Sequence, residues 1–306
     1  MKHLIIANPV ANQGNAQTTI VEMQAYLNQL DIEYELVITE YPGHAIELAK
    51  SSAQAGYERV VAAGGDGTVN EVVNGLMQVK EAGSSLPILG VLTIGRGNDF
   101  AFSMGVPADW KVGCQALKDG RIRQIDIGRV ESELFPNGRY FCNGVGSGFD
   151  TIVGFEAAKM KYLHGMMSYL VAAVKTIFLF QAPRLQIDLD GQSMTQPCAM
   201  VSIMNGRRMG GSFLMAPESQ GDDGLLDLCI AGDITRMETV GLLPRFMKGT
   251  QAGHPKIQFA RARKIDIQAL DGTIPAHADG ETLCTSGKFL KIELLPRQIE
   301  LLYKPE

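Results

Sequence analysis

The chain lacks an excess of basic residues and has few cysteines, none of them close to another. Its formal net charge over 306 residues is −5, whereas proteins that bind nucleic-acid phosphates usually carry a basic patch. The five cysteines are far apart, and no two form a C-x-x-C pair. These absences argue against nucleic-acid binding, a disulfide framework and a cysteine zinc site, and they favour a reducing compartment.

The chain also has no apolar stretch long enough to cross a bilayer. Its most apolar run, from Met166 to Phe180, is interrupted by Lys175 and is shorter than the ~20 residues that a spanning helix needs. The first residues contain one lysine and too short an apolar run for a signal peptide. We therefore expect a cytoplasmic protein without a transmembrane segment. The five histidines are scattered, which gives no basis for a histidine metal site or a Ser-His-Asp triad.

The predicted elements divide the chain near residue 125. Before it, apolar strands alternate with helical patterns, as in βαβ units with a parallel sheet, the strands being His3 to Ala7, Glu33 to Thr39, Val60 to Ala63 and Ile88 to Leu92. After it, short strands separated by Asp-Gly turns predominate, at 124–130, 139–145, 184–189, 199–205, 225–230, 264–269 and 289–295. Helices are expected only at about 155–180 and 236–247 in this part.

The fold expected from this pattern has two domains. Residues 1–125 would form an α/β domain with a mainly parallel sheet, and residues 126–306 a mostly antiparallel, β-sandwich-like domain. The last ten or so residues are candidates for packing back on the first domain. Two domains also suit the length of 306 residues, of which 45% are hydrophobic.

A glycine-rich turn follows the third predicted strand. Gly64, Gly65 and Gly67 flank Asp66, and a helical pattern of Val69, Val72, Val73 and Leu76 follows. Glycines leave backbone N–H groups accessible, and a helix N-terminus attracts anions, so the turn suits a phosphate. The alternative is an ordinary strand-to-helix turn in which Asp66 and Thr68 only cap the helix. The spacing matches neither the P-loop nor the dinucleotide-binding pattern.

Two further polar turns should reach the same edge of the sheet, because parallel strands end there together. One is Asn8-Pro9-Val10-Ala11-Asn12-Gln13-Gly14, after the first strand, and the other is Gly95-Arg96-Gly97-Asn98-Asp99, after the fourth. Each is also compatible with a simple connecting turn. Three more segments in the second part of the chain are rich in glycine or acidic residues: 143–150, 205–227 and Ala278-Asp279-Gly280-Glu281.

Taken together, these segments resemble the diacylglycerol kinase catalytic-domain family. The family includes bacterial lipid kinases and sphingosine kinases, with NAD kinases as distant relatives. The matching segments occur in the family's order: Asn8-Pro9, Gly64 to Asn70, Asn98-Asp99-Phe100, Gly148-Phe149-Asp150, Asp223-Gly224-Leu225 and Asp279-Gly280-Glu281. Asn12 replaces a family glycine, and asparagine tolerates the left-handed backbone of such a turn. Arg96 replaces a family threonine, and its guanidinium could clamp a triphosphate or obstruct the usual pose.

The resemblance implies a nucleotide site, a general base and a structural metal. ATP and Mg²⁺ would be the cofactors. Residues expected to bind the nucleotide are Asn8, Thr39, Gly64, Gly65, Asp66, Gly67, Thr68, Asn70, Arg96, Asn98 and Asp99. Glu281 is the candidate general base, and Asp66 is either the competing candidate or the organiser of phosphate and metal. The structural Mg²⁺ would be bound by the side chain of Asp223 and the backbone of Gln220 and Leu225.

The implied reaction is transfer of the γ-phosphate of ATP to a hydroxyl of diacylglycerol or a similar lipid. An apolar helical stretch at 162–180, rich in Met and Phe, would suit an acyl chain, although such a helix is equally typical of a core. The lipid would be presented at a membrane surface, where the protein would be peripheral, and the resemblance also allows a homodimer. The alternatives are an NAD kinase-type phosphotransferase and a nucleotide- or lipid-binding regulator that has lost catalysis.

Overall fold

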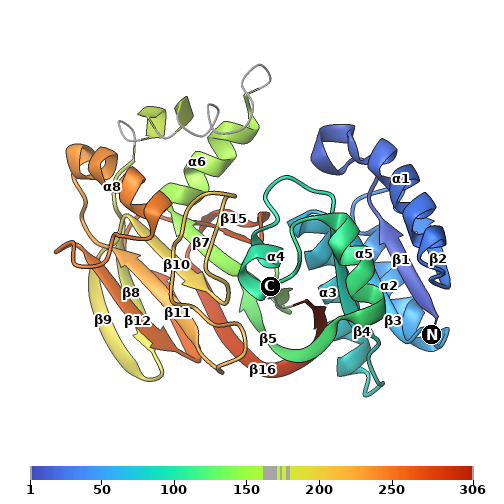
Figure 1. Cartoon of the computed structure of the whole chain (residues 1–306). Helices are drawn as coiled ribbons and strands as arrows, with labels where there is room; N and C mark the ends of the chain where they lie inside the picture. Colours follow the sequence, from blue (N-terminus) through green and yellow to red (C-terminus); the bar gives the residue numbers. More distant parts are fainter. Residues whose placement is uncertain (1, 161–170, 173, 177–179, 305–306) are drawn as a thin grey trace.

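The first half of the chain is built on four parallel strands (Figure 1). The computed structural model describes residues 2–160, 171–172, 174–176 and 180–304. Strands β1 (His3–Ala7), β2 (Tyr34–Ile38), β3 (Arg59–Gly64) and β4 (Ile88–Thr93) pair in parallel in the order β2-β1-β3-β4. Every residue of β1 and β3 is buried, as expected of parallel strands covered on both faces. The predicted parallel sheet is therefore confirmed.

Helices cover both faces of this sheet. They are the short 3-10 helix Ala11–Gly14, α1 (Ala16–Gln29), α2 (His44–Gln54), α3 (Asp66–Glu81), α4 (Asp99–Met104) and α5 (Trp110–Asp119). Helix α3 buries Val69, Val72, Val73 and Leu76, the apolar positions that the sequence places at helical spacing. Helices α4 and α5 were not expected, and α4 is only six residues long.

The second half contains a six-stranded antiparallel sheet in the order β12-β11-β10-β7-β14-β15. These strands are β7 (Gly144–Gly148), β10 (Met200–Met204), β11 (Leu226–Ala231), β12 (Ile257–Ala262), β14 (Ile274–Ala278) and β15 (Glu281–Gly287). Its inner face packs on β8 (Arg184–Leu189), β13 (Lys264–Ala269) and β16 (Phe289–Tyr303), with Ile187, Ile203, Leu228 and Ile265 in the shared core. The β-sandwich-like second half is therefore confirmed.

The predicted strand 139–145 is wrong, because two strands of different sheets occupy this segment. Strand β6 (Arg139–Phe141) pairs with β5 (Arg121–Glu131), whereas β7 pairs with β10 and β14. At the break, the backbone N–H groups of Cys142, Asn143 and Gly144 donate to the carboxylate of Asp279 instead of to a neighbouring strand. Strands β9 (Gln192–Pro197), β12, β14 and β15 were also missed.

One long strand joins the two halves. Strand β16 pairs with β13 and β5, and its last part reaches β4, where Leu301 pairs with Leu89 in parallel. The register between β16 and β5 shifts between Leu295 and Ile299, where Arg297 has a positive φ of 52°. The predicted strand 289–295 thus continues past this irregularity to Tyr303. The result is one ten-stranded sheet, and β5 and β16 run beneath both halves in Figure 1.

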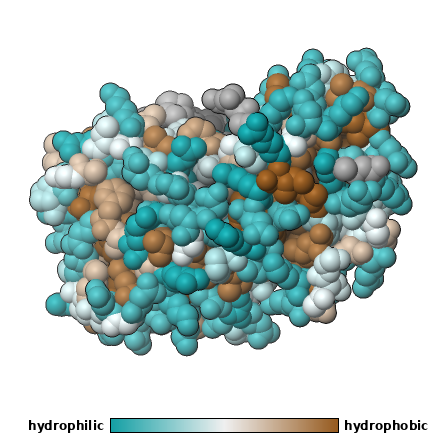
Figure 2. All heavy atoms as spheres, turned by 60° about the horizontal axis from the view of Figure 1, so that its bottom comes forward, coloured by the Kyte–Doolittle hydropathy of each residue, from teal (hydrophilic) through white to brown (hydrophobic). Residues whose placement is uncertain are grey.

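Two described helices lie over the six-stranded sheet (Figure 1). Helix α6 (Phe149–Ala158) begins earlier than the predicted helix 155–180, most of which lies outside the described residues. Helix α8 (Arg236–Lys248) agrees with the predicted 236–247 and starts at a capping box of Thr235 and Glu238. No helix within the described ranges is long and apolar enough to span a membrane. Hydrophilic residues predominate on the face in Figure 2, with hydrophobic residues in small groups.

Candidate nucleotide and acceptor site

Three turns meet where the parallel strands β1, β3 and β4 end. Asn8, after β1, donates from Nδ2 to Oγ1 of Thr68 in the first turn of α3, at 3.1 Å. The backbone N–H of Gly95, after β4, donates to the carbonyl of Gly64 at 3.1 Å. A Cβ on Gly95 would lie 2.4 Å from the Cα of Gly65, so the two turns touch backbone to backbone. This close approach requires glycine.

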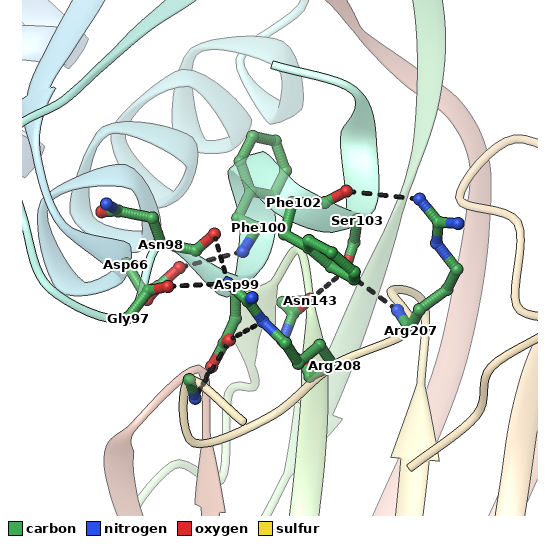
Figure 3. Close-up of polar contacts among 11 residues, drawn as sticks. Asp66, Gly97, Asn98, Asp99, Phe100, Phe102, Ser103, Asn143, Arg207 and Arg208 are labelled. Carbon is green, nitrogen blue, oxygen red and sulfur yellow. Dashed lines mark hydrogen bonds and ion pairs between the residues drawn. The ribbon is translucent and has the colours of Figure 1, made fainter. Parts of the chain in front are cut away.

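Asp66 lies at the N-terminus of α3 and faces the turn after β4 (Figure 3). Its Oδ1 accepts a hydrogen bond of 2.9 Å from the backbone N–H of Phe100. Burial and, to a smaller extent, the neighbouring carboxylate of Asp99 together raise the pKa of Asp66 to about 6. Asp66 is therefore a carboxyl group that can exchange a proton near neutral pH.

Asp99, at the start of α4, is held by a loop of the second half (Figure 3). Its Oδ1 accepts from Nε of Arg208 at 2.7 Å, and its Oδ2 accepts from the backbone N–H of Gly211 at 2.9 Å. Arg208 also donates from Nη2 to the carbonyl of Gly97 at 2.8 Å and lies over the ring of Phe102. The guanidinium therefore fixes both the backbone and the carboxylate of the turn after β4.

Arg208 was missed as a site residue, although it belongs to the glycine-rich segment that begins at Asn205. The adjacent Arg207 donates its backbone N–H to Oγ of Ser103 at 2.9 Å, and Ser103 donates to Oδ1 of Asn143 at 3.2 Å (Figure 3). Asn143 in turn donates from Nδ2 to the carbonyl of Arg208 at 2.9 Å. These bonds close a network between α4, the loop after β10 and the start of β7.

Asp279, in the turn between β14 and β15, has a buried side chain that accepts several hydrogen bonds from other parts of the chain. Besides the three N–H groups at the break between β6 and β7, it accepts from Nδ2 of Asn70 at 3.0 Å. Asn70 is fully buried and also donates to the carbonyl of Tyr140. With these donors engaged, Asp279 and Asn70 position the turn relative to α3, and Asn70 has no surface with which to contact a nucleotide.

The turn that Asp279 fixes carries Glu281 to the N-terminus of α3. Oε1 of Glu281 lies 3.7 Å from the point where a Cβ on Gly67 would be. Glu281 is exposed, so its carboxylate faces the space next to the glycine-rich turn. The structure thus brings Glu281 next to Gly67, although the two residues are far apart in the sequence.

The remaining expected nucleotide residues lie around this centre. Arg96 is exposed on the turn after β4 and lines the adjoining cavity. Asn98 adopts a left-handed backbone with φ of 49° and donates from Nδ2 to the carbonyl of Gly95. Thr39 follows β2 at the edge of the sheet, where its backbone N–H donates to the carbonyl of Ala7 at 2.9 Å; it is not among the residues that line the cavity.

A cavity of about 1610 Å³ extends from these turns into the second half. Its polar end is lined by Asp66, Arg96, Asp99 and Asp279. Its other end is lined mainly by apolar side chains of α6, α8 and the sheet beneath them, including Val153, Met200, Met215, Leu242 and Phe246. One continuous space therefore joins a polar end, lined by three aspartates and Arg96, to an apolar end that can hold a hydrocarbon chain.

The segment expected to bind a structural Mg²⁺ is already neutralised by arginine. Oδ2 of Asp223 pairs with Arg261, and its Oδ1 accepts from the backbone N–H of Leu225 at 3.0 Å. Arg261 also pairs with Asp227 at 3.0 Å. Among the described residues no three His, Cys, Asp or Glu side chains gather as they would around a metal ion. In this arrangement Arg261 pairs with the carboxylate expected to bind the ion, and a magnesium site at Asp223, Gln220 and Leu225 stays a prediction.

The fold and the site define a two-part protein in which a glycine-rich turn at the end of a parallel sheet adjoins the apolar end of the cavity, called the apolar chamber below. The profile of the diacylglycerol kinase catalytic domain matches residues 2–130, and that of the YegS C-terminal NAD kinase beta sandwich-like domain matches residues 143–303. The chain therefore belongs to the diacylglycerol kinase catalytic-domain family with its NAD kinase-like sandwich. The resemblance noted in the sequence is confirmed, and family membership implies the use of ATP.

Individual relatives agree with this assignment. The diacylglycerol kinase of Bacillus subtilis is 28% identical and that of Mycobacterium tuberculosis 27%, each alignment covering at least 90% of this chain and 88% of the relative. A diacylglycerol kinase structure from Bacillus anthracis has a TM-score of 0.74 at 22% identity, covering 99% of this chain and 97% of that one. Yeast NADH kinase complexed with NADH has a TM-score of 0.53 at 11% identity, covering 99% and 84%. The two structures support the fold alone.

Proposed function

We propose that the protein is an ATP-dependent lipid kinase that phosphorylates a hydroxyl of diacylglycerol or a similar lipid. The observation that carries this proposal is the single cavity that runs from the glycine-rich turn to the apolar chamber between α6 and α8. An acceptor with a long hydrocarbon chain can bury it there, while its hydroxyl reaches the phosphate end. The apolar lining favours a lipid over NAD as the acceptor.

In this proposal residues 1–125 form the nucleotide domain. The backbone N–H groups at Gly64 to Thr68, at the N-terminus of α3, hold the phosphates, and Arg96 adds a bidentate clamp from the facing turn. Asn8, Asn98 and Asp99 set the positions of these turns through the bonds described above. ATP enters as its magnesium complex, which supplies charge neutralisation for phosphoryl transfer.

Residues 126–306 provide the acceptor side. Glu281 is the general base that takes the proton of the attacking hydroxyl, because its carboxylate faces the glycine-rich turn at Gly67. Asp66, whose pKa is raised to about 6 by burial, organises the phosphate end and is the competing proton acceptor. Asp279 holds the Glu281 turn in place through its four N–H donors.

We further propose that α8 faces a membrane that presents the lipid. Met237, Val240 and Met247 are 81%, 53% and 41% exposed and are spaced three and seven residues apart, so they share one face of the helix. Arg245 and Lys248 stand in its last turn and suit anionic headgroups. Met237→Glu with Val240→Glu should reduce co-sedimentation with phosphatidylglycerol vesicles, whereas Leu134→Glu, at another exposed apolar position, should not. Equal sedimentation of both variants would contradict this orientation.

The reaction is tested by offering labelled ATP with a panel of acceptors: dioctanoylglycerol, phosphatidylglycerol, sphingosine and NAD. We expect label in a lipid and none in NAD. Glu281→Gln should lower kcat by about a hundredfold or more, the range of a lost general base, whereas Glu300→Gln, at an exposed position of β16, should not change it. Labelling of NAD alone would favour the NAD kinase alternative, and ATP binding without any product would favour a regulatory protein. Full activity of Glu281→Gln would shift the base to Asp66.

A further inference from the structure

Asp150, at the start of α6, carries a buried carboxyl oxygen without a partner. Its Oδ1 accepts from the backbone N–H of Thr151 at 2.8 Å and from Oγ1 of the same residue at 3.4 Å. Its Oδ2 is buried and has no hydrogen-bond partner within the described part of the chain. Asp150 also lines the cavity. A buried polar atom in this condition is rare in proteins and is expected where a ligand supplies the missing bond.

The side chain of His277, on β14, lies close to Oδ2 of Asp150. A Cβ on Gly146 would lie 2.5 Å from Nε2 of His277 and 2.7 Å from Oδ2 of Asp150. The two side chains therefore both lie against Gly146, and any larger residue at position 146 would displace them. Nδ1 of His277 accepts from the backbone N–H of Gly280 at 3.4 Å, which assigns the ring proton to Nε2. His277 thus offers a donor next to the free oxygen of Asp150.

Burial disfavours charge on both groups, so His277 is neutral at neutral pH and a protonated form of Asp150 is present there. Desolvation raises the pKa of Asp150 to about 7 and lowers the pKa of His277 to about 4. No ion pair with Asp150 is found among the described residues. When Asp150 is protonated, its proton resides on Oδ2, because Oδ1 already accepts from Thr151. The pair then presents two donors to the cavity, an O–H and an N–H.

The pair lines the cavity together with the Asp279–Gly280 turn and with the apolar side chains of α6. His277 stands two residues before Asp279, on the strand that leads into the Glu281 turn. Phe149, Val153 and Met200 line the apolar chamber on the other side. A lipid with its hydroxyl at Glu281 and its chains in the chamber would pass Asp150 and His277 between the two.

We infer that Asp150 and His277 form a subsite for the ester carbonyl oxygens of the acceptor, with Oδ2–H of Asp150 and Nε2–H of His277 as donors. The inference rests on the proposed lipid kinase activity and narrows its acceptor to glycerol esters. A sphingoid base does not satisfy the pair in the same way, because it presents an ammonium group and hydroxyls in place of carbonyls. Neither residue takes part in the phosphoryl transfer.

Replacing Asp150 by asparagine or by leucine distinguishes a subsite for ester carbonyls from a merely structural role. Because Thr151 donates to one oxygen, the carbonyl of an asparagine must take that place, which leaves its NH₂ where Oδ2 now lies. Asp150→Asn therefore keeps a donor toward the cavity. Asp150→Leu keeps a similar volume and removes the donor. Asp266→Asn, at an exposed position of β13, is the matched control for the loss of one carboxylate.

The experiment measures KM for dioctanoylglycerol and for its dioctyl ether analogue, which lacks both carbonyls, with the full-length protein and each variant. We expect the wild type to prefer the ester by about tenfold, the size of one hydrogen bond in a binding site. Asp150→Asn and Asp266→Asn should keep this preference. Asp150→Leu should raise KM for the ester about tenfold without changing KM for the ether or for ATP. His277→Phe should also reduce the preference, and thermal melting of each variant monitors folding.

Three outcomes would overturn the inference. A wild type that uses ester and ether equally has no carbonyl subsite. A loss in Asp150→Asn as large as that in Asp150→Leu would show that a carboxylate is needed, as for an ammonium ligand, and preferential labelling of sphingosine would agree with that result. If the wild type phosphorylates no lipid of the panel at all, the proposed function itself fails, a result distinct from the first two.

Discussion

Oε1 of Glu281 lies 3.7 Å from the position that a Cβ on Gly67 would take. Glu281 begins β15, whereas Gly67 belongs to the first turn of α3. The contact exists because Asp279, two residues before Glu281, is bound by Asn70 of the same helix at 3.0 Å. The proposed general base and the glycine-rich turn are thus held in one arrangement by the buried amide of Asn70 and the buried carboxylate of Asp279.

Replacing Gly67 by alanine should raise the stability of the protein and lower its activity. An alanine in the first turn of a helix is more stable than glycine by roughly 0.5 to 1 kcal/mol, and at 3.7 Å from Glu281 the added methyl meets ordinary contact. The same methyl stands between the turn and the base, so we expect kcat/KM to fall by about tenfold or more. Thermal melting and steady-state kinetics check the two effects.

The matched control for this change is Gly241→Ala in α8, where an added Cβ meets nothing within 4 Å. It should bring a similar gain in melting temperature with unchanged kinetics. If Gly67→Ala retains full activity, the space between the glycine-rich turn and Glu281 is not where the phosphate is transferred.

Asp66→Asn should stabilise the protein more at high pH than at low pH. The pKa of Asp66 rises from its ordinary 3.8 to about 6 in the folded state, mainly through burial, so the folded protein binds this proton more tightly than the unfolded chain. The contribution of Asp66 to stability therefore falls as pH rises from about 4 to 6 and stays low above that. Asparagine removes this penalty, and we expect a gain of roughly 2 to 3 kcal/mol in the free energy of unfolding at pH 8.

Urea denaturation at pH 4.5 and pH 8 measures the difference between Asp66→Asn and the wild type. Activity should be lost at both pH values if Asp66 organises the phosphate end. The exposed Asp266→Asn change should show no such pH dependence. An equal difference at both pH values would mean that the Asp66 carboxyl titrates normally.

Arg208→Lys should weaken nucleotide binding although the charge is kept. The guanidinium donates to Oδ1 of Asp99 at 2.7 Å and to the carbonyl of Gly97 at 2.8 Å, and a lysine ammonium cannot reproduce this planar geometry. The turn that carries Arg96 would lose one of its supports. We expect KM for ATP to rise by about tenfold, with a smaller change in kcat.

The neighbouring Arg207→Lys is the control, because among the described residues the Arg207 guanidinium makes only a long bond of 3.3 Å to the carbonyl of Phe102 and a ring contact with the same residue. Both variants should be compared by ATP titration at saturating acceptor. Equal KM values for ATP in Arg208→Lys and Arg207→Lys would show that the Asp99 contact is not needed for the nucleotide.

The parts of the site that follow strand ends were predictable from the sequence. Gly64 ends the buried strand β3, Asn8 and Gly95 follow the strands β1 and β4, and parallel strands of one sheet end at the same edge. The contacts that bring in the second half were not. Arg208 forms an ion pair with Asp99, and Asp150 lies close to His277, because of the way the strands of the second half pair. The local sequence does not show which of these strands pair with each other. Only the family resemblance connected Glu281 with Asp66.

Two errors in the predicted strands have the same physical origin. The segment 139–145 reads as one apolar strand, but Asp279 takes three of its N–H groups and turns the chain from one sheet into the other. The strand that begins at Phe289 is predicted to end at residue 295, before Pro296, yet the backbone passes that point with Arg297 at a positive φ and continues to Tyr303. In both cases a distant residue or sheet decides the pairing, which local sequence does not encode.

Removing Arg261 should reveal whether the Asp223 turn can bind a cation. Arg261 pairs with Asp223 and with Asp227 at 3.0 Å, and burial raises the pKa of Asp227 in spite of this pair. Without the guanidinium, two carboxylates are left unneutralised, so Arg261→Ala should lose about 1 kcal/mol in the absence of metal and regain it with millimolar Mg²⁺. The melting temperature of the wild type, measured without nucleotide, should not respond to Mg²⁺. A response of the wild type that disappears in Asp223→Asn would instead establish a structural magnesium ion at this turn.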